Sequence, residues 1–152
     1  MISESYPEAG FSMWIIYALL AAILWGLNYS LSERILNSIS PVSLLALEMA
    51  AGGIFFSIIA SFTTLKQDWK SLMTEPNLFW ITLLEVVVVI LASFFIVSSV
   101  RAKNATAAGI IELIYPLFII FFSWVLFREN HVNASVISGG IFIFIGVLLI
   151  SR

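Results

Sequence analysis

The chain has 152 residues, of which 61% are hydrophobic and only 11% are charged. A soluble domain is nearer about 45–50% apolar and about 25% charged, so this composition predicts an integral membrane protein. The formal net charge of -2 gives no basic patch for a nucleic-acid partner, and the lack of cysteine excludes disulfides and thiolate metal sites. The single histidine cannot build a metal site alone, so we expect no metal and no cofactor.

Long apolar stretches predict an all-α membrane protein, a bundle of five transmembrane helices in one domain covering residues 1–152. A spanning helix needs about 20 apolar residues. The stretches that meet this length are about 12–32, 41–65, 78–100, 105–127 and 132–150. Pro41 suits a helix start, and Asn104 and Asn133 are expected to cap the last two helices. The link at residues 66–77 is polar, and its Trp69 suits the membrane interface.

Basic residues in the loops are almost evenly divided between the two sides of the membrane. The side that holds the N-terminus has Lys66, Lys70 and Arg128, and the other side has Arg34, Arg101, Lys103 and Arg152. Loop charge normally sets orientation, so this balance indicates either orientation by other signals or insertion in both directions. A chain this small needs a partner to build a pathway, and insertion in both directions would supply an antiparallel one.

Three acidic residues lie inside the expected spans, at Glu48, Glu85 and Glu112, and no lysine or arginine lies there to neutralise them. Each must be protonated, hydrated or matched to a cationic ligand, because hydrocarbon does not solvate a charge. At about 1.5 Å per residue, Glu48 and Glu112 lie roughly 10 Å below one surface. Trp25 and Asn28 reach a similar depth, and Glu85 enters from the opposite surface. In an antiparallel dimer, the partner's copy of Glu85 would reach the same layer.

The fourth predicted helix combines a carboxylate with a helix breaker. Glu112 shares a face with Pro116, and Tyr115 lies beside that face. Proline frees a backbone carbonyl one turn earlier, which adds an acceptor near the acid. We therefore expect Glu112 to bind a solute or a proton. The alternative is a neutral hydrogen bond between helices, which we favour for Glu48 and Glu85.

Small residues form two stripes at helical spacing. One stripe is Ala46, Ala50, Gly53, Ser57 and Ser61, and the other is Ser135, Gly139 and Gly146. Small residues let helices approach closely in lipid. Each stripe fits packing within one chain or a seam between two copies.

Several short motifs resemble the EamA domain of the drug/metabolite transporter superfamily. They are Trp25-Gly26-Leu27-Asn28, Ile39-Ser40-Pro41, the run from Arg101 to Gly109, Tyr115-Pro116-Leu117-Phe118, Phe127-Arg128-Glu129 and a glycine-rich end. The resemblance implies a five-helix repeat. Many members carry two such repeats of inverted topology and move metabolites or toxic compounds, usually outward; short members are expected to pair. The acid that defines the related small multidrug resistance proteins is missing, because the first helix has no acid before Glu33.

These features together predict a transporter of a small solute in the cell inner membrane, an exporter of a metabolite or of a cationic or zwitterionic compound, coupled to protons. It would act as a homodimer, antiparallel, or as a heterodimer with a similar half. The predicted solute or proton site is Glu112, Glu48, Asn28, Trp25, Tyr115 and Glu85, with Pro116 as the helix break. No enzyme motif is present, so we expect no catalytic residues. The alternatives are an obligate half of a heterodimeric transporter and a membrane assembly or scaffold protein without transport.

Overall fold

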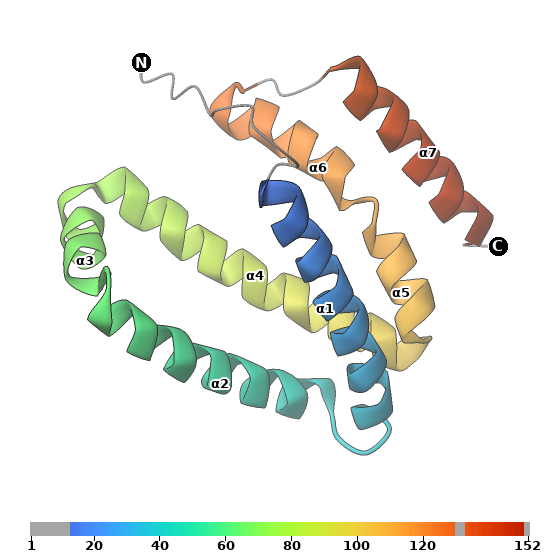
Figure 1. Cartoon of the computed structure of the whole chain (residues 1–152), viewed down its shortest axis with the longest axis horizontal. Coiled ribbons are helices and arrows are strands. Elements are labelled where there is room, and N and C mark those ends of the chain that lie inside the picture. Colours follow the sequence, from blue (N-terminus) through green and yellow to red (C-terminus); the bar gives the residue numbers. More distant parts are fainter. Residues whose placement is uncertain (1–12, 130–132, 151–152) are drawn as a thin grey trace.

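A computed structural model describes residues 13–129 and 133–150, and every regular element in these two ranges is helical. Figure 1 shows the path of the chain, with α2 and α4 running in opposite directions and α3 joining them. The elements are α1 (Met13–Ile35), α2 (Pro41–Phe62), α3 (Leu65–Thr74), α4 (Pro76–Ala102), α5 (Ala105–Glu112), α6 (Tyr115–Phe122), the π-helical segment η1 (Ser123–Phe127) and α7 (Ala134–Ile150).

Within residues 13–129 and 133–150, four segments are long and apolar enough to cross a bilayer. They are Met13–Ile35, Pro41–Phe62, Pro76–Ala102 and Ala105–Phe127, the last of which is built from α5, α6 and η1. The fifth predicted span corresponds to α7, which has 17 residues and is shorter than the other four. At about 1.5 Å per residue this helix is roughly 25 Å long. Its predicted start at residue 132 lies outside the described ranges.

The predicted helix caps are present. The side chain of Asn104 accepts a hydrogen bond from Ala107 N–H at 2.7 Å, and that of Asn133 accepts one from Val136 N–H at 2.9 Å. Ser40 caps α2 in the same way, just before Pro41. Each cap satisfies a backbone donor that the first turn of a helix leaves without a partner. Local sequence therefore fixes where these helices begin.

Most of the polar link predicted at residues 66–77 forms a helix, α3. Its apolar residues are spaced for one face of a helix: Leu65, Trp69, Leu72 and Met73. Lys66 and Lys70 lie on one flank of that face, and Asp68 lies on the other. The helix is amphipathic, and the second span ends at Phe62 rather than residue 65.

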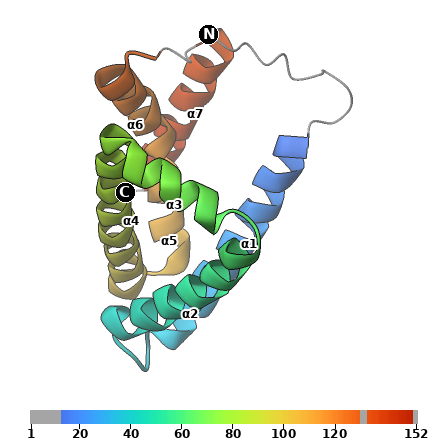
Figure 2. The same cartoon turned by 90° about the vertical axis from the view of Figure 1, so that its left-hand side faces the viewer.

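The core lies at one end of the molecule. Leu36, Leu44, Val97, Val100, Ala105 and Ala108 form its buried cluster. This is where the C-terminal ends of α1 and α4 meet the N-terminal ends of α2 and α5 (Figure 1). From there the helices diverge, and the start of α1 lies well apart from α4, α6 and α7 (Figure 2).

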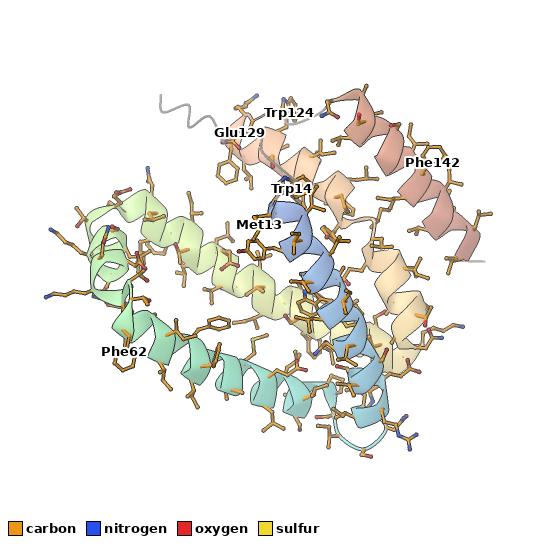
Figure 3. The ribbon with its side chains drawn as sticks, in the orientation of Figure 1. Met13, Trp14, Phe62, Trp124, Glu129 and Phe142 are labelled. Atoms are coloured by element: carbon orange, nitrogen blue, oxygen red, sulfur yellow. The ribbon has the colours of Figure 1, made fainter. Side chains whose placement is uncertain are left out.

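Away from this core, large apolar side chains cover the outside of the helices. Phe62 is 85% exposed and Phe142 is 76% exposed, and both project away from the ribbon (Figure 3). Folded proteins in water rarely expose an apolar surface of this extent, because contact between apolar groups and water is unfavourable. The chain is a multi-pass membrane protein, and lipid is the natural solvent of this surface.

The last helix returns to pack against the interrupted fourth span. Gly140 of α7 is buried, and a Cβ atom added to it would lie 2.8 Å from Leu117 Cδ2 in α6. Gly139 and Gly146, from the predicted stripe on this helix, face open space, as does Gly53 of the α2 stripe. Within one chain, α7 also contacts α5, and its buried residues are Gly140 and Val147, neither of which the predicted stripe includes.

A carboxylate from α1 caps α5. Oε2 of Glu33 accepts a hydrogen bond from Ala105 N–H at 2.7 Å, beside the Asn104 cap of the same helix. A negative charge at a helix N-terminus is stabilised by the free N–H groups and by the helix dipole. This bond joins α1 to α5 through two residues that are 72 positions apart in the sequence.

Replacing Glu33 with alanine is expected to lower thermal stability. The lost cap is worth about 1 kcal/mol, or roughly 2–4 °C in the midpoint of unfolding for a chain of this size. Circular dichroism of the detergent-solubilised protein measures this midpoint. Glu75→Ala is the matched control, because Glu75 precedes α4 and its side chain makes no capping bond. Equal midpoints for the two variants would contradict the assignment of the cap.

Candidate functional site

The fourth span is interrupted directly after Glu112. Helix α5 ends at this residue, a turn occupies Leu113 and Ile114, and α6 begins at Tyr115 with Pro116 in its first turn. The turn is tightened by i to i−3 hydrogen bonds, from Leu113 N–H to the Ile110 carbonyl at 3.2 Å and from Ile114 N–H to the Ile111 carbonyl at 3.3 Å. Pro116 has no N–H, so it cannot donate to the carbonyl of Glu112, four residues earlier.

Glu112 is paired with a residue that the sequence analysis did not single out. The phenol O–H of Tyr29, on α1, donates a hydrogen bond to Oε2 of Glu112. Both side chains are half-buried. A neutral donor stabilises a carboxylate in a poorly solvated place without cancelling its charge. The bond therefore gives the Glu112 carboxyl group a polar partner inside the span.

The ring of Tyr29 is held between an indole and a glycine. Its centroid lies 5.6 Å from that of Trp25, and the two rings meet edge to face at 61°. On the other side, a Cβ atom added to Gly109 would lie 3.3 Å from Cδ2 of Tyr29. Glycine at position 109 thus lets the ring approach the backbone of α5 closely enough for the phenol to reach Glu112.

Of the predicted site residues, Trp25 and Glu112 belong to this cluster, which we call the Tyr29–Glu112 site: Trp25, Tyr29, Gly109 and Glu112. Trp25 is 58% exposed. A spacing of four residues puts Trp25 and Tyr29 on one helix face, and this spacing was the available signal for Tyr29.

Two further polar candidates, Asn28 and Tyr115, are sequence neighbours of the site or of the break without joining the cluster. Asn28 is half-buried and precedes Tyr29, so it points about 100° away from it around α1. Tyr115 opens α6 and is 53% exposed. Tyr115 directly follows the break along the chain and Asn28 is the neighbour of Tyr29 on α1, and the roles of both residues stay predictions.

The other two membrane carboxylates lie on different helices. Glu48 is half-buried on α2, and Glu85 is exposed on α4. Across the described residues, no group of three acidic or histidine side chains is close enough to hold a metal ion. Within one chain, then, Glu48, Glu85 and Glu112 do not form a single acidic cluster.

The long apolar helices define this chain as a multi-pass membrane protein, and the comparisons with known proteins place it in the transporter class. Residues 12–152 match the EamA-like transporter family, and the chain belongs to that family. It is also 28% identical over 139 residues to an uncharacterized transporter of Archaeoglobus fulgidus. That alignment covers 91% of this chain but only 47% of the relative, so the chain spans about half the length of the curated relative that it matches. No solved structure matches the chain.

Proposed function

We propose that the chain carries a small solute across the cell inner membrane, as one five-helix repeat of a dimeric transporter. The observation that carries this proposal is the hydrogen bond from Tyr29 to Glu112 beside the interrupted helix. A carboxylate with a neutral partner can exchange that partner for a cation or a proton. A break in the same helix supplies the flexibility that a change of access needs.

The chemistry of the site favours a cationic or zwitterionic solute over an anion. Glu48, Glu85 and Glu112 lie well inside the spans, whereas the basic residues Arg34 and Arg101 lie in the last turns of α1 and α4. The ring of Trp25 beside Tyr29 adds an aromatic surface on which an ammonium group can rest. Asn28, Tyr115 and Glu48 would line the rest of the cavity.

Two observations support a second copy as the missing half. The helices of one chain meet at one end only, and the small-residue stripes of α2 and α7 face open space at Gly53, Gly139 and Gly146. The relative from Archaeoglobus fulgidus is about twice as long as the aligned region. In an antiparallel pair, the exposed Glu85 of one copy would face the site of the other. A similar half encoded separately could take the place of the second copy.

Transport is tested with purified protein in liposomes that hold a pH-sensitive dye. We expect protonated amines or zwitterionic amino acids to drive proton movement, and organic anions to drive none. Protein-free liposomes give the background. No solute-dependent signal from any class would contradict the proposal and favour the scaffold alternative.

Orientation is tested separately with reporter groups on the C-terminus that give a signal on one side of the membrane only. Signals from both sides are expected for an antiparallel homodimer. A signal from a single side would exclude insertion in both directions and favour a heterodimer.

A further inference from the structure

A cleft lies at the junction of α2 and α3, far along the chain from the Tyr29–Glu112 site. Its lining residues are Ser61, Leu65, Lys66 and Trp69, and its volume is about 470 Å³. Sites for small molecules commonly have volumes of about 300–1,000 Å³. This cleft has the size for a bound headgroup and the start of an acyl chain.

The position of the cleft places it at the surface of the bilayer. The span Pro41–Phe62 ends at its edge, and the amphipathic helix α3 begins there after a turn at Thr63 and Thr64. The apolar side chains of α3 are largely outside the core, since Leu65 is 47% exposed and Trp69 is 60% exposed. An amphipathic helix of this kind lies in the interface, with its apolar face toward the acyl chains.

The lining of the cleft is matched to one kind of molecule. Lys66 brings an ammonium group and the Trp69 indole brings a neutral donor, while the Ser61 hydroxyl already donates to the Ile58 carbonyl at 2.7 Å. Leu65 and the indole face supply apolar surface beside these donors. Lys70 lies one turn further along the same flank of α3, so a second positive charge is near, while Asp68 lies on the opposite flank. Positive and hydrogen-bonding groups above an apolar wall suit a phosphate joined to an acyl chain.

We propose that this cleft binds the phosphate headgroup of an anionic phospholipid, with Lys66 as its charge partner and Trp69 against its glycerol and upper acyl chain. The inference does not depend on what the protein transports. A basic residue beside an amphipathic helix on a membrane surface is a recurring way to hold an anionic lipid. The bound lipid would hold α3, and thereby the ends of α2 and α4, at a fixed depth.

Quenching of Trp69 by brominated lipid tests the proposal. The full chain is placed in phosphatidylcholine vesicles with a rising fraction of brominated phosphatidylglycerol, and the same series on Trp69→Phe gives the signal of the other tryptophans. We expect saturable quenching, stronger than that by brominated phosphatidylcholine. One surface lysine is worth about 1 kcal/mol, so Lys66→Gln should weaken the apparent lipid affinity about fivefold.

Lys70→Gln is the matched control, because it removes the same charge one turn away and outside the cleft. At the same salt concentration it should weaken the apparent lipid affinity less than Lys66→Gln does, because its charge lies outside the cleft. Equal losses in the two variants, or quenching that does not distinguish the two lipids, would overturn the proposal in favour of general surface attraction. Loss of quenching on adding inorganic phosphate would also overturn it, because a soluble phosphate would then be the ligand.

Discussion

Glu112→Gln is expected to slow solute-driven proton movement in liposomes strongly while the protein stays folded. The amide oxygen of glutamine can still accept the hydrogen bond from Tyr29, so the contact between α1 and α5 is kept. The amide cannot ionise, so it can neither pair with a cation nor carry a proton. The bond that is lost is the one between the carboxylate and the cationic group of the solute. Hydrogen bonds to charged groups contribute about 1.5–3 kcal/mol, so the transport rate should fall roughly 10- to 100-fold.

Glu75→Gln is the control for this result, because Glu75 lies between α3 and α4, outside the spans. It should transport at the wild-type rate at equal protein density in the vesicles. Indistinguishable traces from Glu112→Gln and wild type would remove Glu112 from the mechanism.

Tyr29→Phe, alone and combined with Glu112→Gln, tests whether Tyr29 and Glu112 act together in transport. The phenylalanine ring keeps the contact with Gly109 and removes only the hydroxyl donor. If the two residues act together, Tyr29→Phe slows transport in the wild-type background and changes nothing further in the Glu112→Gln background. A further loss in the double variant would show that Tyr29 acts on its own.

Pro116→Leu is expected to slow transport and to leave the protein as stable as wild type or more so. Leucine restores an N–H that can donate to the carbonyl of Glu112, which favours joining α5 and α6 into one helix. A stiffer fourth span raises the barrier to any change of access that bends it. An increase of about 1.4 kcal/mol in that barrier would slow the rate roughly tenfold.

Pro76→Leu is the matched control. Pro76 also lies in the first turn of a helix. It opens the continuous helix α4, however, and does not follow an interruption inside a membrane span. Both variants are measured for flux and for thermal unfolding. A wild-type rate in Pro116→Leu would show that the break is not used in transport.

The spans were predictable because long apolar runs admit few other structures in a chain of this composition. The sequence did not predict at which end of the bundle these helices meet. The spanning helices are apolar on nearly every side, so their sequences do not single out one face for packing. The splayed arrangement in Figure 2 follows from a few contacts between distant residues, such as those of Glu33 and Tyr29 with α5.

The candidate site was predictable in part for a similar reason. Glu112 and Pro116 stood out because a charge and a helix breaker are unusual in hydrocarbon. Tyr29 did not, because an aromatic residue in an apolar helix resembles the many that face lipid. Helix α3 was missed because Lys66, Asp68 and Lys70 gave its sequence the polarity of a loop, while the apolar face was only four residues wide.

The two bonds from α1 to α5 have a mechanical consequence. Glu33 holds the first residue of α5 and Tyr29 holds its last, with the ring seated on Gly109 between them. Because α5 is bonded to α1 at its first and last residues, we expect these two helices to move together as one rigid unit. The break at Leu113 and Ile114 separates this unit from α6, and α7 bridges the break, because it packs against α5 and also meets α6 where Leu117 lies against Gly140.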